Sequence, residues 1–100
     1  MPTMIVLVNL KEGIAPEEYE RWLEERYVPA ILQLDSVDEW YGYRVGGGGE
    51  PPYDYVVSVA INDLEQLGRD MEGERVQRLL GELGQYVDVT QLITERFVSA

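Results

Sequence analysis

Apolar positions divide the chain into segments with two kinds of spacing. Residues 3–10, 53–61 and 86–98 contain runs or alternations of apolar and β-branched residues, which are typical of β-strands. Residues 36–45 (SVDEWYGYRV) are rich in aromatic side chains and predict a further strand. Residues 16–34 instead repeat apolar side chains every three or four positions, as an amphipathic helix does. Its predicted apolar stripe contains Tyr19, Trp22, Leu23, Tyr27, Ala30, Ile31 and Leu34.

Proline and acidic residues mark the first predicted helix. Pro16 suits the first helical position, and Glu17 and Glu18 lie where the helix dipole favours negative charge. Pro29 cannot donate a backbone hydrogen bond, and its ring crowds the preceding turn. We therefore expect a kink or a break near Tyr27–Val28.

A second helical region follows the third predicted strand. Asn62 is the predicted N-cap, with Glu65 three positions later as in a capping box. The segment MEGE at residues 71–74 predicts a break. A helix with one apolar face then resumes at residues 74–83.

The last predicted strand has an imperfect alternation. Its apolar side is interrupted at Gln91 and Glu95. A charge on that side at Glu95 or Arg96 needs a partner or water. A salt bridge between subunits is the predicted role of this pair.

The predicted order of elements is β-α-β-β-α-β over one domain, residues 1–100. This order favours an α+β, ferredoxin-like fold, in which two helices cover one face of a four-stranded antiparallel sheet. Several of the strands are apolar on both faces, so the uncovered face of the sheet also needs burial. A second copy of the chain would provide it, and we expect a homodimer.

The charge balance limits the partners. The chain has 8 Lys+Arg against 19 Asp+Glu, a formal net charge of −11. Such a surface repels phosphate backbones and anionic lipids, so neither nucleic acid nor a membrane is an expected partner. No apolar run is long enough to span a bilayer, and no signal-peptide pattern is present, which favours the cytoplasm.

The chain contains no histidine and no cysteine. The commonest general base, the usual haem ligand and thiolate metal ligands are therefore missing. We expect no metal site and no cofactor. Acid–base chemistry would have to come from Asp, Glu, Tyr, Lys, Arg or the substrate.

The glycine run at residues 46–49 admits several interpretations. A phosphate-binding loop would open a helix and supply Lys and Ser or Thr, whereas here the next predicted element is a strand. A linker between domains would need a longer chain. The main interpretation is a connection between two strands, and folding over a pocket is a second possible role.

Tyrosine and tryptophan side chains gather around this loop and on the first helix. Their apolar rings and polar tips suit a pocket for a flat, apolar or aromatic small molecule, and equally an ordinary core with a dimer interface. Asn9 ends the first strand as a polar anchor or as a turn residue, and Arg44 would reach an anionic group. The candidate binding residues are Asn9, Trp22, Tyr41, Tyr43, Arg44, Tyr53 and Tyr55.

Several segments resemble a known family. YERWLEERYVPAIL resembles the first helix of the dimeric α/β-barrel superfamily, where many members carry a His-x-Pro element; here Tyr27 takes the histidine position. LDSVDEWYGYRV, YDYVVSVAINDLEQLG and LITERFV are more specifically similar to the RedY/HapK-like family. The resemblance implies a homodimer whose two sheets form one barrel. It also implies a cyclase-like or other accessory step on an aromatic intermediate of pigment biosynthesis.

These observations leave three hypotheses. The first is a small metal-free enzyme of secondary metabolism, a cyclase, isomerase or cofactor-independent oxygenase that acts on an aromatic or polyketide-like intermediate. The second is a carrier or ligand-binding protein, and the third is a structural dimer without catalysis. Tyr27 is the candidate catalytic residue, because a phenol is a poor base at neutral pH but can donate a hydrogen bond or proton to an oxyanion.

Overall fold

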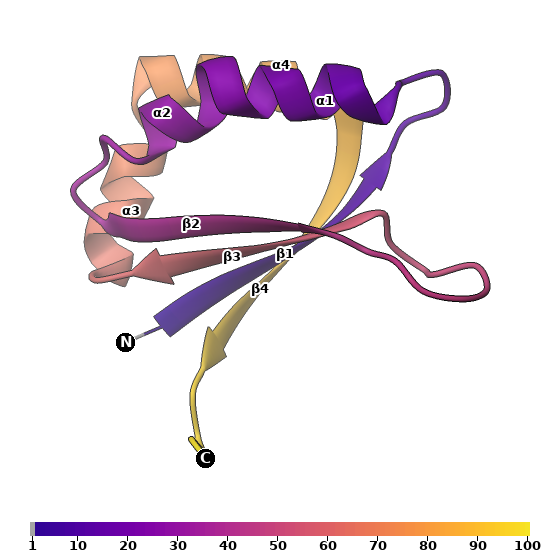
Figure 1. Cartoon of the computed structure of the whole chain (residues 1–100). Helices are drawn as coiled ribbons and strands as arrows, with labels where there is room; N and C mark the ends of the chain where they lie inside the picture. Colours follow the sequence, from indigo (N-terminus) through magenta and orange to yellow (C-terminus); the bar gives the residue numbers. More distant parts are fainter. Residues whose placement is uncertain (1) are drawn as a thin grey trace.

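The computed structural model describes residues 2–100 and contains one four-stranded antiparallel sheet with helices over one face (Figure 1). The strands are β1 (Pro2–Leu10), β2 (Val37–Arg44), β3 (Tyr55–Ile61) and β4 (Val87–Glu95). Their order across the sheet is β2-β3-β1-β4. This architecture confirms the predicted α+β, ferredoxin-like fold.

The helical layer contains α1 (Pro16–Trp22), α2 (Val28–Ile31), α3 (Leu64–Met71) and α4 (Glu74–Tyr86). A π-helical turn, η1 (Leu23–Tyr27), joins α1 to α2 without an interruption. The irregularity predicted near Tyr27–Val28 is therefore a widened turn and not a break.

Pro29 accounts for the widened turn. Proline offers no N–H to the preceding turn and its ring needs extra space there. The N–H of Val28 donates to the carbonyl of Leu23, five residues back, which is the pattern of a π-turn. Proline is tolerated just after it because it occupies the first turn of α2.

The π-turn keeps one row of side chains on the sheet-facing side. Tyr19, Leu23, Tyr27 and Ile31 follow one another at intervals of four residues. A regular helix has about 3.6 residues per turn, so such a row would drift around it. One wider turn reduces the drift, and Tyr27 and Ile31 still point to the sheet with Leu23.

The core lies between the helices and the sheet. β3 alternates strictly, and its helix-facing residues Val57, Val59 and Ile61 are 5%, 2% and 0% exposed. From the helices, Tyr19, Ala30 and further apolar residues belong to the same buried cluster, and the ring of Tyr19 packs edge-on against that of Tyr55. The apolar positions that predicted the strand and the helix are thus the positions that are buried in the structure.

The second helical region begins one residue later than predicted. The N-cap of α3 is Asp63, whose carboxylate accepts the N–H groups of Glu65 and Gln66 at 3.0 and 3.1 Å. Asn62, the predicted cap, instead donates from its side chain to the Asp35 carbonyl, at 2.8 Å. Both residue types favour caps, and the tertiary contact of Asn62 decides between them. The break predicted at residues 71–74 is present between α3 and α4.

The last strand is shorter than predicted. β4 pairs with β1 along the whole length of β1, and this pairing ends where Pro2 lies opposite Glu95. Residues 96–98 therefore have no strand partner in the described chain. The side chain of Phe97, expected on the apolar side of the strand, is 96% exposed.

No described helix covers the second face of the sheet (Figure 1). Side chains alternate along paired strands, so this open face carries Ile5 and Leu7 of β1. Leu92 of β4 lies opposite Ile5, and Tyr41 and Tyr43 of β2 lie one strand further away, beyond Ser58 and Val56 of β3. Tyr41, Tyr43 and Leu92 are 51%, 54% and 46% exposed. The two-sided apolar character predicted for the sheet is therefore observed. Among residues 2–100, no helix has the length and apolar character needed to cross a membrane.

The glycine run lies in the connection between β2 and β3, as its main interpretation predicted. Gly47 and Gly49 have φ angles of 102° and 82°, a region that favours glycine. The segment projects beyond the end of the sheet, away from the helical layer (Figure 1). It precedes a strand, so it does not have the loop-to-helix geometry of a phosphate-binding loop.

Candidate functional site

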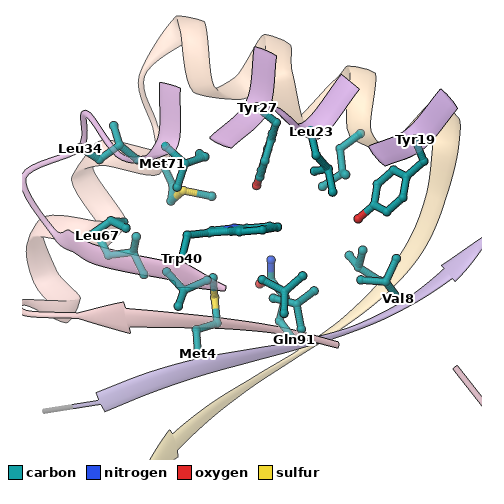
Figure 2. A pocket seen from close by; sticks show the side chains of 17 residues that line it. Met4, Val8, Tyr19, Leu23, Tyr27, Leu34, Trp40, Leu67, Met71 and Gln91 are labelled. Carbon is teal, nitrogen blue, oxygen red and sulfur yellow. The ribbon is translucent and has the colours of Figure 1, made fainter. Parts of the chain in front are cut away.

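A largely apolar cavity lies between the helical layer and the sheet (Figure 2). Its volume is about 40 Å³, enough for a few water molecules. Side chains from β1, β2, β3 and β4 form its floor, and helical residues form its roof. Its apolar lining consists of Met4, Val6, Val8, Leu23, Ile31, Leu34, Val37, Trp40, Val57, Val59, Leu67, Met71, Leu83 and Val89.

Three polar side chains reach this apolar space: Tyr19 and Tyr27 from the first helix and Gln91 from β4. In Figure 2 the hydroxyl of Tyr27 points down toward the indole of Trp40, and the amide of Gln91 rises from the sheet on the other side. Within residues 2–100, none of these three side chains forms a hydrogen bond to another protein group. Tyr19 is buried and Tyr27 half-buried, whereas Gln91, on the β4 side of the cavity, is exposed. The two hydroxyls and the amide are therefore available to a guest in the cavity.

Burial keeps both phenols protonated. It raises the pKa of Tyr27 above the ordinary value of a tyrosine. Burial also raises the pKa of Tyr19, and the neighbouring Tyr27 and Tyr55 add to that effect. At neutral pH both hydroxyls are therefore hydrogen-bond donors and not phenolates.

The cavity contains no stronger acid or base. Apart from the two tyrosines, none of the described residues that line it is titratable. Among residues 2–100 there is also no cluster of acidic side chains arranged to hold a metal ion. The arrangement can thus orient a carbonyl or hydroxyl group and stabilise a developing oxyanion, but proton abstraction would depend on the substrate or on water.

A wider groove of about 440 Å³ runs along the outer edge of β2, next to the cavity. Its polar side is built around Glu20. The carboxylate of Glu20 accepts hydrogen bonds from Arg44 Nε at 2.8 Å and from the Tyr55 hydroxyl at 2.7 Å. These bonds, that of Arg44 first, lower the pKa of Glu20 to about 2. The guanidinium of Arg44 is therefore paired within the chain.

The structure separates the residues predicted for the site. Of the eight predicted residues, all within residues 2–100, Tyr27 lines the cavity, and Tyr43, Arg44 and Tyr55 line the groove. Trp22 turns toward α4 instead: its indole N–H donates to Glu82 at 3.1 Å, and its ring packs against Tyr27.

The other predicted residues lie away from both hollows. Tyr41 is on the open face of the sheet. Asn9 donates from its side chain to the carbonyl of Pro52 at 3.2 Å, which ties β1 to the connection before β3. Tyr53 belongs to that same connection. Alternation along the strands accounts for this, since neighbours in sequence point to opposite faces.

Among the aromatic and polar residues that line the cavity, three were not predicted for the site: Tyr19, Trp40 and Gln91. Gln91 left a signal, because it is a polar residue on the otherwise apolar side of the last strand. Tyr19 lies on the predicted stripe of the first helix, where it resembles any core residue. Trp40 could be found only by knowing which face of β2 the helices cover.

Comparison with known proteins identifies the family. Residues 2–97 match the family described as REDY-like protein HapK. Among solved structures, HapK from Hahella chejuensis is 24% identical with a TM-score of 0.84, over 100% of this chain and 96% of that one. No match was found among curated proteins.

More distant structures share the fold. SnoaB from Streptomyces nogalater, a cofactor-independent oxygenase, is 12% identical with a TM-score of 0.80, over 98% of this chain and 94% of that one. A dimeric ferredoxin-like protein of unknown function from Thermobifida fusca is 10% identical with a TM-score of 0.74, over 93% of this chain and 88% of that one. These three structures establish the fold alone, whereas the family match covers nearly the whole chain. It confirms the resemblance noted in the sequence: the chain belongs to the RedY-like HapK family.

Proposed function

We propose that this protein binds a flat, uncharged aromatic intermediate of secondary metabolism between its helices and its sheet, and promotes its rearrangement or oxidation without a metal or cofactor. One observation supports this most directly. An apolar cavity contains the hydroxyls of Tyr19 and Tyr27 and the amide of Gln91, none with a partner within residues 2–100. A small-molecule site typically combines apolar walls with a few convergent polar groups.

The polar groups define what the chain can contribute. Tyr27 and Tyr19 donate hydrogen bonds to a carbonyl or enolate oxygen, and Gln91 both donates and accepts. The lining is otherwise apolar, so a guest that fills the cavity displaces water from these groups and strengthens those bonds. Because no base lines the cavity, a suitable substrate has a carbon acid that ionises readily by itself.

The oxygenase variant of the proposal is supported by the shared fold with SnoaB. A balanced model reaction is the conversion of anthrone and O₂ into anthraquinone and water. Anthrone loses a proton from its methylene carbon to water and becomes an enolate. The enolate gives electrons to O₂ and forms a C–O bond at that carbon, and the peroxide takes up the released proton. Loss of water from the hydroperoxide then breaks the O–O bond and the remaining C–H bond and leaves the quinone carbonyl. Tyr27 would hold the enolate oxygen throughout.

Binding without turnover is the second candidate. It is favoured by one specific observation, the lack of a titratable base among the described lining residues. A carrier would need only the apolar walls and the hydrogen-bond donors. The two candidates share a site and differ in whether product forms.

The protein is also proposed to work as a homodimer. The open face of the sheet exposes Tyr41, Tyr43 and Leu92 around the apolar side chains of β1. A ferredoxin-like structure that shares the fold is described as dimeric. Pairing of two open faces would bury this surface and leave the cavity on the other side of each sheet accessible.

Binding can be tested with 1-aminoanthracene, a neutral three-ring fluorophore. We expect saturable enhancement of its fluorescence, and a loss of about threefold to tenfold in affinity in Tyr27→Phe, as for one neutral hydrogen bond. Tyr53→Phe is the matched control, since Tyr53 lies outside the cavity, and should bind as the wild type does. Absence of saturable binding would refute the proposed site and favour a structural dimer.

Turnover can be tested with anthrone in air-saturated buffer. An oxygenase should form anthraquinone faster than buffer alone, and Tyr27→Phe should lower the rate about tenfold to a hundredfold. A protein that binds the probe without accelerating this or a related cyclisation would be assigned as a carrier.

A further inference from the structure

The cavity and the groove along β2 are separated by only two side chains. Leu23 and Trp40 are the residues that line both hollows. Leu23 is 9% exposed and belongs to the core, whereas Trp40 is only partly buried and lies on β2, at the edge of the sheet. Figure 2 shows the indole lying flat across the middle of the cavity, below Tyr27.

Gly42 gives the indole this position. A Cβ atom on residue 42 would lie 2.9 Å from Cζ3 of Trp40, closer than real Cβ atoms come, and 3.0 Å from Cη2. The ring therefore rests directly on the backbone of β2. Any larger residue at position 42 would require the ring to shift.

The volumes show that this position is not compatible with a large ligand. The cavity measures about 40 Å³, whereas pockets for drug-sized molecules measure roughly 300–1,000 Å³. The groove on the far side of the indole measures about 440 Å³. A molecule of several rings can use the cavity only if the indole moves and the two hollows become one.

We propose that Trp40 is the specificity-determining residue of this site: its indole is a movable wall, and ligands longer than a single ring displace it and extend from the cavity into the groove. This inference rests on the proposed function, because it concerns the same cavity. It adds a second subsite and a residue that selects ligands by length.

The groove also constrains the charge of the ligand. Glu20 and Glu24 line it, and the single cation of its lining, Arg44, is bound to Glu20. The net formal charge of these three groups is negative. The outer end of the ligand is therefore neutral or cationic, and an anionic end is disfavoured.

Two amines of different length test the wall. In Trp40→Ala, affinity for 1-aminoanthracene should rise about tenfold, because no indole has to be displaced. Affinity for aniline should fall about threefold, because a single ring loses its aromatic neighbour. An increase in affinity for 1-aminoanthracene together with a decrease for aniline would identify the indole as the wall. A general loss of structure would instead weaken the binding of both probes.

A second variant does not depend on removing the indole. Gly42→Ala places a methyl group under the ring and should push it toward Tyr27, so that 1-aminoanthracene binds at least threefold more weakly. In the double variant Trp40→Ala/Gly42→Ala, the added methyl group should have no effect on affinity. Such coupling shows that residue 42 acts through Trp40.

Three outcomes would overturn the inference. Equal changes in affinity for the two amines in Trp40→Ala would show that the indole is an ordinary residue of the cavity floor. Additive effects of the two substitutions on affinity in the double variant would lead to the same conclusion. Equal affinity for 1-aminoanthracene and anthracene-1-carboxylate would refute the charge preference. Failure of the wild type and of Trp40→Ala to bind either amine would instead contradict the proposed function itself.

Discussion

Tyr27 combines an apolar environment with a hydroxyl group that has no partner within residues 2–100. Its ring is fixed by Trp22, with ring centroids 5.2 Å apart, so the hydroxyl has a defined direction. Trp22 in turn is held through its indole N–H by Glu82 of α4. A residue positioned in this way is suited to donate a hydrogen bond without rearrangement.

The ionisation of Tyr27 gives a direct prediction. Burial raises its pKa above the ordinary value of about 10. Its contribution to stability is therefore complete below about pH 10 and is lost as the pH rises through the higher pKa of the folded state. In a spectrophotometric phenolate titration, the difference between wild type and Tyr27→Phe should appear only above about pH 10.

One result of this titration would contradict the raised pKa of Tyr27. A difference curve centred at or below the ordinary tyrosine value would mean that the phenol is solvated or paired with a cation. Circular dichroism recorded at each pH separates ionisation of the folded chain from alkaline unfolding.

The first helix and the edge of the sheet are linked by a single carboxylate. Glu20 of α1 accepts from Arg44 of β2 and Tyr55 of β3, so it holds the helix to both strands beside the groove. Its pKa is lowered to about 2 by these two donors, Arg44 first. A lowered pKa stabilises the folded state above the unfolded value of about 4.5 and stops doing so as the pH falls toward 2.

This link predicts a pH-dependent difference between wild type and Glu20→Gln. The urea midpoint of wild type should be higher at neutral pH, and the difference should shrink between about pH 4.5 and 2. Glu17→Gln, on the same helix, controls for the change in net charge. A difference that stays constant over this range would show that Glu20 is not held by its two donors.

At the scale of elements, periodicity predicted most of the fold and little of the site. The alternation in β3 and the stripe of the first helix correspond to the buried faces, because burial is what imposes these periods. The sequence did not identify the N-cap of α3, because Asn62 and Asp63 are both residue types that favour this position. The end of β4 depends on where β1 begins, which is a pairing between distant segments.

The site needed tertiary information for the same reason. Trp22 and Trp40 are both aromatic residues in amphipathic segments, and only the packed structure shows that Trp40 faces the cavity while Trp22 faces α4. Tyr41 and Tyr43 were predicted for the pocket because they lie on the strand that precedes the glycine run, but Tyr41 lines neither hollow and Tyr43 lines only the groove. The register of β2 with β3 puts them on the side of the sheet away from the cavity.

Considering the whole molecule, the two faces of the sheet differ in what covers them. The covered face forms the core and the cavity, and the open face is an apolar surface on an acidic protein. Residues Ile5, Leu7 and Leu92 on that face need burial that the chain does not provide within residues 2–100.

We therefore expect sedimentation at micromolar concentration to give about twice the chain mass of 11.4 kDa. Leu92→Arg should produce monomers, because it places a charge within the proposed interface. Leu32→Arg is the matched control: Leu32 is also 46% exposed but lies at the end of α2, on the other side of the sheet. A wild type that sediments as a folded monomer would exclude the dimer.

The proposal that an aromatic molecule binds between the helices and the sheet is tested by locating such a molecule in the complex. With 1-aminoanthracene bound to methyl-labelled protein, intermolecular nuclear Overhauser effects report which side chains lie against the rings. We expect contacts to Val57, Val59 and Leu83, which line the cavity. Contacts confined to Ile5, Leu7 and Leu92 would place the ligand on the open face of the sheet and contradict it.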